Sequence, residues 1–362
     1  MDKLNLNKLK NKTLLGIGPV TRRVTEEAVR FSNDNEMPIL LIPSRRQVEC
    51  KEQGGGYVYD TSEFCEVVKK LDTKKTVLLA RDHGGPYQGT NPTDDLDAEM
   101  EQAKFSYFTD IKNGFDILHL DPSIKGKNFN DVVNKIEKLY LHCEEIAEAS
   151  KRDIIYEVGT EEHGSVYSSD PEVLENFNRL AEICSQQFPK VKFIVGNTGP
   201  FVRETFNALP FSLNNAKAMS DIANKHNLLL KEHNLDYTDY KTLCMHPYLN
   251  IHSANVAPEF GTEETRILLQ SLINCEMFLE YDEFLEICFK SKKWKKWLLP
   301  SSSEKDLRHL AIISGHYLME TQRVKEIIEK LNSKMDYELT VRIHIRSIIN
   351  KYAKAFGWIS KK

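Results

Sequence analysis

Three ionisable residues follow a short apolar run in the stretch "TVLLARDHGG" (76–85). Residues 77–80 are apolar or small, and Arg81, Asp82 and His83 come directly after them, before two glycines. A carboxylate can carry a proton in catalysis, and a neutral imidazole is a common metal ligand. The simpler alternative is a core strand that has reached the surface, with Arg81 and Asp82 as an ion pair at the rim. The pattern indicates a catalytic or metal site at the end of a strand.

Histidines recur at such positions along the chain. Five of the eleven histidines stand near the ends of apolar runs, namely His83, His119, His163, His233 and His252. A single histidine of this kind is more often a hydrogen-bonded structural residue than a ligand. Several imidazoles that converge with carboxylates on one point suit a divalent metal, and imidazole suits zinc.

Eight short apolar runs alternate with stretches of helical spacing. The runs are 13–19, 38–44, 76–83, 116–123, 153–164, 192–200, 227–234 and 249–258. Apolar runs without polar alternation need helices over both faces of a sheet or a closed ring. Eight runs predict an α/β fold, a (β/α)8 TIM barrel, with a doubly wound open sheet as the alternative. The segment between the last two runs has room only for a short helix, around 236–243.

A barrel places its active site at the carboxyl ends of its strands. Strands seven and eight adjoin, and strand three lies across the mouth. We therefore expect zinc, or another divalent ion, to be bound by three histidines: His83, His233 and His252. Asp82 would act as general acid/base. Glu157 and Glu161, in the fifth run, are further catalytic carboxylates or alternative ligands.

Polar residues at the same strand ends are candidates for holding a phosphorylated substrate: Arg45, Arg46, Asp121, Asn197, Asn234, Ser253 and Asn255. Ser253 and Asn255 would hold phosphate, because loops after the last two strands often do so in barrels. Arg45 or Arg46 would bind a second phosphate. The alternative for this arginine pair is a solvated surface position.

The chain beyond the eighth run has helical spacing and no strand pattern. We expect a barrel over 1–284 and a helical extension over 285–362 that packs on the barrel, because no Pro/Gly/Ser-rich linker separates them. The basic stretch "KSKKWKKW" (290–297) is interpreted as a solvated helix face.

Composition narrows the function classes. The chain has 362 residues, 41% hydrophobic and 28% charged, with a net charge of −4. This balance offers no basic field for nucleic acid or an anionic membrane. No apolar run is long enough to span a bilayer, and the first residues lack a signal-peptide pattern, so we expect a cytoplasmic protein. The glycines of "QGGGY" (53–57) lack the spacing of a nucleotide-binding loop.

The order of several short motifs resembles a known family. The motifs are "SRRQVECKEQGGGY", "RDHGGP", "GFDILHLDPS", "EVGTEE", "KEHNLDYTDY" and "RIHIRSIINKYAKAFG". Together they are similar to the Z-type accessory subunit of class II D-tagatose-bisphosphate aldolase, over nearly the whole chain. The resemblance implies a TIM barrel, ketose-phosphate metabolism and a possible complex with a catalytic aldolase subunit. The pair Asp82 and His83 also resembles the Asp-His pair of catalytic class II zinc aldolases.

Two segments depart from the accessory pattern. The eighth run, "IHSANVAPEFGTEE", carries a histidine and polar groups, and the second ends in "SRRQV" with two arginines. Three hypotheses follow: a metal-dependent aldolase acting on a phosphorylated sugar through an enediolate, a non-catalytic accessory subunit, and a sugar-phosphate isomerase or epimerase. The protein would form a homo-oligomer or a complex with a catalytic subunit.

Overall fold

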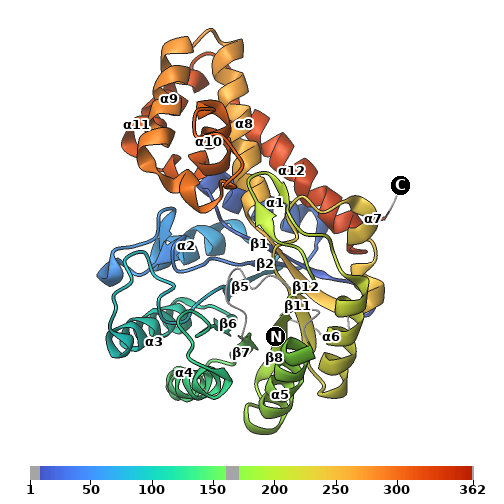
Figure 1. Ribbon diagram of the computed structural model, residues 1–362. Coiled ribbons are helices and arrows are strands. Elements are labelled where there is room, and N and C mark those ends of the chain that lie inside the picture. The colour runs from blue at the N-terminus through green and yellow to red at the C-terminus, as the bar shows by residue number, and fades with distance from the viewer. Residues whose placement is uncertain (1–8, 160–170, 361–362) are drawn as a thin grey trace.

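A computed structural model describes residues 9–159 and 171–360 and shows a closed parallel barrel (Figure 1). Its eight strands are β1 (Leu14–Ile17), β2 (Ile39–Leu41), β5 (Val77–Arg81), β6 (Ile117–Leu120), β7 (Ile155–Val158), β8 (Val191–Gly196), β11 (Leu229–Glu232) and β12 (Ile251–Val256). β1 pairs in parallel with both β2 and β12, which closes the ring. The (β/α)8 prediction is confirmed, and the open sheet is excluded.

Helices surround the barrel in the order that the sequence predicts. They are α1 (Arg22–Asn35), α2 (Thr61–Leu71), α3 (Leu96–Asn113), α4 (Phe129–Ala149), α5 (Pro171–Gln187), α6 (Leu213–Lys225), α7 (Tyr240–Leu243) and α8 (Pro258–Asn274). The short helix expected between the last two strands is α7, followed by the 3-10 turn η3 (His246–Leu249). The loops hold a turn, η2 (Lys51–Gln53), and short strands β3 (Val48–Glu49), β4 (Tyr59–Asp60), β9 (Val202–Arg203) and β10 (Phe206–Asn207).

Alternating side chains of the strands divide between two cores. Leu14, Leu40, Leu78 and Phe193 meet inside the barrel, whereas neighbours such as Leu15 pack outward against the helices. Full burial of a side chain of this size contributes roughly 1.5–3 kcal/mol. Further along several strands the buried positions are polar, as at Glu157, Lys231 and Ser253, so polar side chains increase toward the mouth of the barrel.

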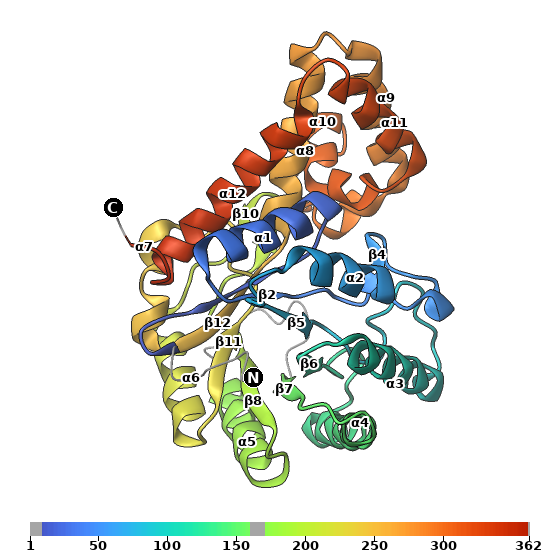
Figure 2. The same ribbon diagram turned by 180° about the vertical axis from the view of Figure 1, so that it is seen from behind.

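The remaining helices extend from α8 and return to the barrel (Figures 1 and 2). They are α9 (Phe278–Ser291), η4 (Lys293–Lys296), α10 (Leu307–Ser314), η5 (Gly315–Leu318), α11 (Gln322–Asn332) and α12 (Tyr337–Ala355). α9 runs through residue 284, the expected boundary of the extension. α12 lies along α1, and Arg346 Nη1 is 2.7 Å from Glu27 Oε1 there. Within the described residues, no helix is long and apolar enough to cross a membrane.

The last residue of β5 is anchored outside the barrel. Arg81 is fully buried, and its guanidinium donates to both carboxylate oxygens of Asp110 on α3, at 2.7 and 2.6 Å. It also donates to the carbonyls of Pro43 at 3.2 Å and Val48 at 2.7 Å. The alternative interpretation, an ion pair between Arg81 and Asp82, is therefore wrong. Because neighbours on a strand point to opposite faces, Asp82 faces the mouth instead.

We expect Asp110→Ala to lower the free energy of unfolding by about 3–5 kcal/mol, because it leaves a buried guanidinium without its carboxylate. Urea denaturation followed by tryptophan fluorescence measures the change. Glu286→Ala is the control, since it removes an exposed pair with Lys290 (2.6 Å) and should cost less than about 1 kcal/mol. Equal stability of the two variants would contradict the anchoring role of Arg81.

Candidate active site

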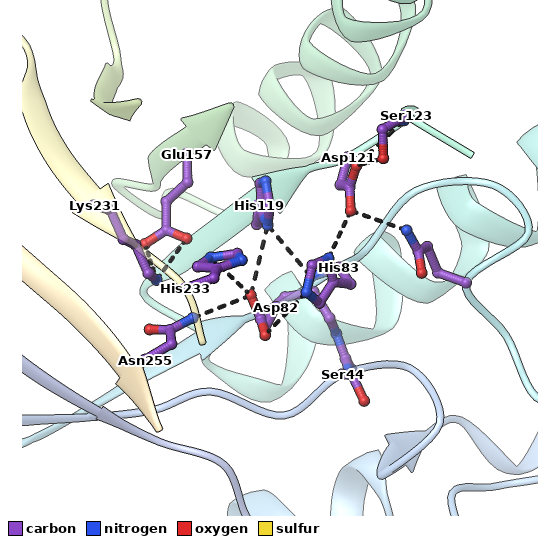
Figure 3. A network of polar contacts seen from close by, with 12 residues as sticks. Ser44, Asp82, His83, His119, Asp121, Ser123, Glu157, Lys231, His233 and Asn255 are labelled. Atoms are coloured by element: carbon purple, nitrogen blue, oxygen red, sulfur yellow. Dashed lines mark hydrogen bonds and ion pairs between the residues drawn. The ribbon is translucent and has the colours of Figure 1, made fainter. Parts of the chain in front are cut away.

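The candidate site lies where β5, β6, β11 and β12 end, and Asp82 stands at its centre (Figure 3). Asp82 follows β5 directly, and its N–H donates to the Pro43 carbonyl at 3.0 Å. The next residue, His83, has a left-handed backbone with φ of 46°. Such a backbone is uncommon for a residue with a side chain and worth noting beside a functional site.

Three imidazoles surround the Asp82 carboxylate (Figure 3). Asp82 Oδ1 is 3.5 Å from His233 Nε2 and 3.6 Å from His119 Nδ1, and Oδ2 is 3.6 Å from His83 Nε2. The ring centroids of the three histidines are 5.0–5.5 Å apart. Asn255 Nδ2 on β12 donates to Asp82 Oδ1 at 3.3 Å. The structure thus brings together Asp82, His83 and His233, as expected, and adds His119.

The imidazoles decide the charge of this carboxylate. Burial by itself raises the pKa of Asp82, but the imidazoles of His83 and His233 and a hydrogen bond from His119 hold that pKa well below its ordinary value. Burial lowers the pKa of His233 well below its ordinary value and outweighs the charge of Asp82, which by itself would raise it. Asp82 is thus ionised and His233 neutral near pH 7, and neutral imidazole is the form that binds a metal.

Asp121 positions His83. Its Oδ2 is 2.7 Å from His83 Nδ1 and accepts a hydrogen bond from Gln88 Nε2 at 2.9 Å. Burial by itself lowers the pKa of His83, but the charge of Asp82 and the hydrogen bond with Asp121 raise this pKa above its ordinary value. The loop after β5 approaches the backbone of Asp121 closely, and it can do so because Gly85 has no side chain. A Cβ at this position would lie only 1.8 Å from the Asp121 carbonyl oxygen. The second glycine of "RDHGG" permits that approach. Asp121 therefore orients His83. The contact with substrate that was expected of Asp121 stays a prediction.

Lys231 and Glu157 form an ion pair inside the barrel. Lys231 Nζ is 2.7 and 2.8 Å from the two oxygens of Glu157, and both side chains are fully buried. Glu157 is therefore engaged, and it belongs to neither group of possible metal ligands described below. The positive charge of Lys231 also contributes to the low pKa of Asp82. A lysine within the apolar run "NLLLKEHN" was the available sequence signal for this pair.

Two groups of three side chains could hold a metal ion, and His119 belongs to both. The ligand atoms of each group lie within 4.8 Å of one another; the groups are Asp82, His119 and His233, and His83, His119 and Asp121. The Nε2 atoms of His119 and His233 are buried and have no hydrogen-bond partner among the described residues. Imidazole nitrogens and carboxylate oxygens form a donor set that fits zinc. The sequence places His119 at a strand end, but no role was predicted for it. Its position two residues before Asp121, on the same face of the strand, was the available signal.

The expected position of His252 at the carboxyl end of its strand is wrong. β12 continues to Val256, so His252 is its second residue, where the pairing with β11 slips by one position. His252 belongs to neither group of possible ligands. Ser253 is likewise inside the strand, paired with Lys231 and Leu14, and is fully buried. Only Asn255 of this segment reaches the mouth.

The arginines expected to bind phosphate have different environments. Arg45 is buried, and it donates to Glu49 Oε2 at 2.6 Å, to the Gly85 carbonyl at 3.1 Å and to Gln53 Oε1 at 2.5 Å. Each of its three nitrogens has a protein partner, and Arg45 lines neither of the two cavities described below, so its expected phosphate contact stays a prediction. Arg46 is exposed and lines the cavity above Asp82.

Two neighbouring cavities open above the imidazoles. The larger, of about 430 Å³, is lined by Arg46, Asp82 and Asn255, and the smaller, of about 240 Å³, by His119, Asp121 and Asn197. Both are lined by His83, His233 and Asn234. The larger has the size of a typical small-molecule site. Asn234 and Asn197 therefore lie where a substrate would contact them. Glu161 and His163 lie outside the described residues.

Comparison with known proteins places the fold. No protein-family model matches the chain, and no curated protein matches it. A probable tagatose 6-phosphate kinase from Sinorhizobium meliloti 1021 is similar in structure, with a TM-score of 0.75, 19% identity, and 95% of this chain and 100% of that chain covered. A fructose-bisphosphate aldolase from Campylobacter jejuni has a TM-score of 0.58 and 10% identity, with 99% and 95% covered. A fructuronate-tagaturonate epimerase from Cohnella laeviribosi has a TM-score of 0.58 and 12% sequence identity, and the match covers 96% of this chain and 82% of that chain. At such identities the likeness is one of fold.

We expect Gly85→Ala to lower the free energy of unfolding by about 1–3 kcal/mol, because its Cβ collides with the backbone at Asp121. Gly89→Ala, in the same loop, is the control, because its Cβ would come no closer than 3.4 Å to another atom. Its effect should stay within about 0.5 kcal/mol. Urea denaturation of both variants measures the difference, and an unchanged Gly85→Ala protein would contradict the close approach of the two loops.

Proposed function

We propose that the protein is a metal-dependent, aldolase-like enzyme of carbohydrate metabolism that acts on a phosphorylated ketose. The observation that carries this proposal is the Asp82 carboxylate among three imidazoles at the barrel mouth. The motif order that resembles the tagatose-bisphosphate aldolase family supports it, and so does the fold shared with a fructose-bisphosphate aldolase. The kinase name of one neighbour is not carried over, because the chain has no GxxxxGK[ST] or GxGxxG stretch.

Asp82 would transfer the proton in this reaction. As an ionised carboxylate, it accepts the proton of the substrate hydroxyl beside the carbon–carbon bond that breaks. That hydroxyl carbon becomes a carbonyl, and the electron pair of the broken bond passes toward the neighbouring carbonyl and forms an enediolate. Protonation of the enediolate carbon completes the cleavage. Asn255 holds the carboxylate in place through Asp82 Oδ1.

His119, which belongs to both groups of possible ligands, would hold the metal together with His83 or His233, with zinc as the expected ion. When bound, the ion supplies a Lewis acid that polarises the substrate carbonyl. Asp121 would keep His83 in the correct orientation and tautomer through the contact at Nδ1, as carboxylates commonly do for metal-binding histidines.

Two other functions are distinguished from an aldolase by the zinc-binding and cleavage experiments described below. An isomerase or epimerase would use the same proton transfer without bond cleavage, and one neighbour of this fold is named as an epimerase. An accessory subunit of a catalytic aldolase would bind its partner and do no chemistry, as the family resemblance implies.

We expect the purified protein to bind about one zinc ion per chain, as imidazole-rich open sites do. His119→Ala and His233→Ala should each weaken zinc binding by more than about 100-fold, since even losing a residue that only orients a ligand costs 10–100-fold. Competition with a chromophoric chelator measures the affinity. His252→Ala is the matched control and should retain its metal. Zinc loss in His252→Ala but not in His119→Ala would overturn the proposed ligand set.

Asp82→Asn should lower kcat for ketose-bisphosphate cleavage by about 10²–10⁴-fold, because it removes the proton acceptor. The zinc content of Asp82→Asn is measured beside the wild type, because Asp82 belongs to one group of possible ligands and a loss of zinc would identify it as a ligand. A coupled assay that traps the triose products measures cleavage. Epimer formation without trapped products would support the epimerase instead. Absence of both metal and turnover, after reconstitution with zinc, would support an accessory subunit.

A further inference from the structure

The basic segment after α9 lines the cavity above Asp82. Lys292, Lys293, Lys296 and Trp297 line the larger cavity, and Lys296 and Trp297 also line the smaller one. The solvated part of the earlier interpretation is confirmed for the three lysines, which are exposed. The helical part is wrong, because α9 ends at Ser291 and the chain turns into η4. Lys295, in the same turn, lines neither cavity.

This segment is held in place from two sides. The Trp297 Nε1 donates to the hydroxyl of Tyr317 at 3.1 Å. On the other side, the Glu204 N–H donates to the Trp297 carbonyl at 3.3 Å, and Leu299 N–H donates to Glu204 Oε1 at 2.9 Å. Glu204 lies between β9 and β10, in the loop that follows β8. The turn therefore joins the helical extension to a barrel loop at the mouth.

Three cations from distant parts of the chain face this space. Arg46 follows β2, Arg203 ends β9 and Lys296 ends η4; Arg46 and Lys296 line the larger cavity, and Arg203 and Lys296 the smaller. Lys296 is exposed where it lines the two cavities, and nearby protein atoms replace part of its water. This partial desolvation, followed by the charges of Arg46 and Arg203, lowers the pKa of Lys296 to about 8. The charges that act on this amine are thus repulsive, and an anion would relieve the repulsion.

We propose that Arg46, Arg203 and Lys296 form a subsite that binds an anionic group of the substrate beside the imidazoles. The inference deepens the proposed function and rests on it, because it takes this cavity as the place of reaction. The contacts with Glu204 and Tyr317 give the turn a fixed position from which Lys296 can meet a ligand. The helical extension would then supply specificity to a site whose chemistry comes from the barrel.

The chemistry of the three side chains defines the ligand. Guanidinium groups bind phosphate or carboxylate through paired, charge-assisted hydrogen bonds, and lysine adds a point charge. The anion could be the phosphate of a sugar phosphate or the carboxylate of a sugar acid. Lys296 and Trp297 line both cavities, so the anion would sit where the two spaces meet, close to His83 and His233.

The first test measures inorganic phosphate binding to the zinc-loaded full chain by isothermal titration calorimetry. Lys296→Gln should weaken phosphate binding about tenfold, because it removes one charge-assisted contact. Arg46→Gln should have a similar effect. Lys295→Gln is the matched control, since it removes the same charge from the same turn, and its affinity should stay within about twofold of the wild type. Equal effects of Lys295→Gln and Lys296→Gln would overturn the subsite, since they would reveal only a general field.

The second test uses substrates. Lys296→Gln should raise KM for a ketose phosphate about tenfold, leave kcat nearly unchanged and not affect an uncharged ketose. Inhibition by a hexuronate, weakened in Lys296→Gln, would support a carboxylate as the source of the anion; inhibition only by phosphate esters would support a phosphate. Phosphate binding that depends on Lys296 in a protein without turnover would retain the subsite and reject the proposed reaction. Turnover with unchanged KM in Lys296→Gln would reject the subsite alone.

Discussion

The buried pair of Arg81 and Asp110 is the constraint on which the site depends. It anchors the last residue of β5 to α3, outside the barrel, with two short hydrogen bonds. Because adjacent strand residues face opposite ways, this anchor turns Asp82 toward the mouth. An uncompensated guanidinium in that position would be costly, so the pair leaves little freedom for the strand end. The position of the Asp82 carboxylate thus depends on the buried partners of the residue before it.

Charge balance organises the mouth around that carboxylate. Asp82 lies among three imidazoles, and Asp121 contacts His83 from the other side. Beneath them, Lys231 is compensated by Glu157, so a lysine can lie fully buried in the barrel. Above them, Arg46, Arg203 and Lys296 are mutually repulsive. Charges inside the barrel are therefore paired, whereas the cations at the entrance of the cavities lack a paired carboxylate partner among the described residues. A positively charged entrance suits an anionic substrate.

The helical extension reaches the larger cavity through two turns, η4 and η5. Most of its helices pack against α8 and each other, and α12 returns along α1 (Figures 1 and 2). Among the described residues of the extension, those that line the larger cavity are Lys292, Lys293, Lys296, Trp297, His316 and Tyr317. A barrel scaffold commonly gains specificity from added segments at its carboxyl face, since its strands and helices are already committed to the core.

The sequence by itself determined the fold and the centre of the site. Eight apolar runs alternating with helical stretches define a closed parallel barrel, and "RDHGG" with "KEHN" places Asp82, His83 and His233 at its mouth. Tertiary structure alone decided the rest. Strand length moved His252 away from the mouth, since β12 runs four residues past it, and packing gave Arg45 and Glu157 buried partners. Likewise, folding brings Arg46, Arg203 and Lys296 to two adjoining cavities, because no local pattern can report the proximity of segments that lie far apart in a chain.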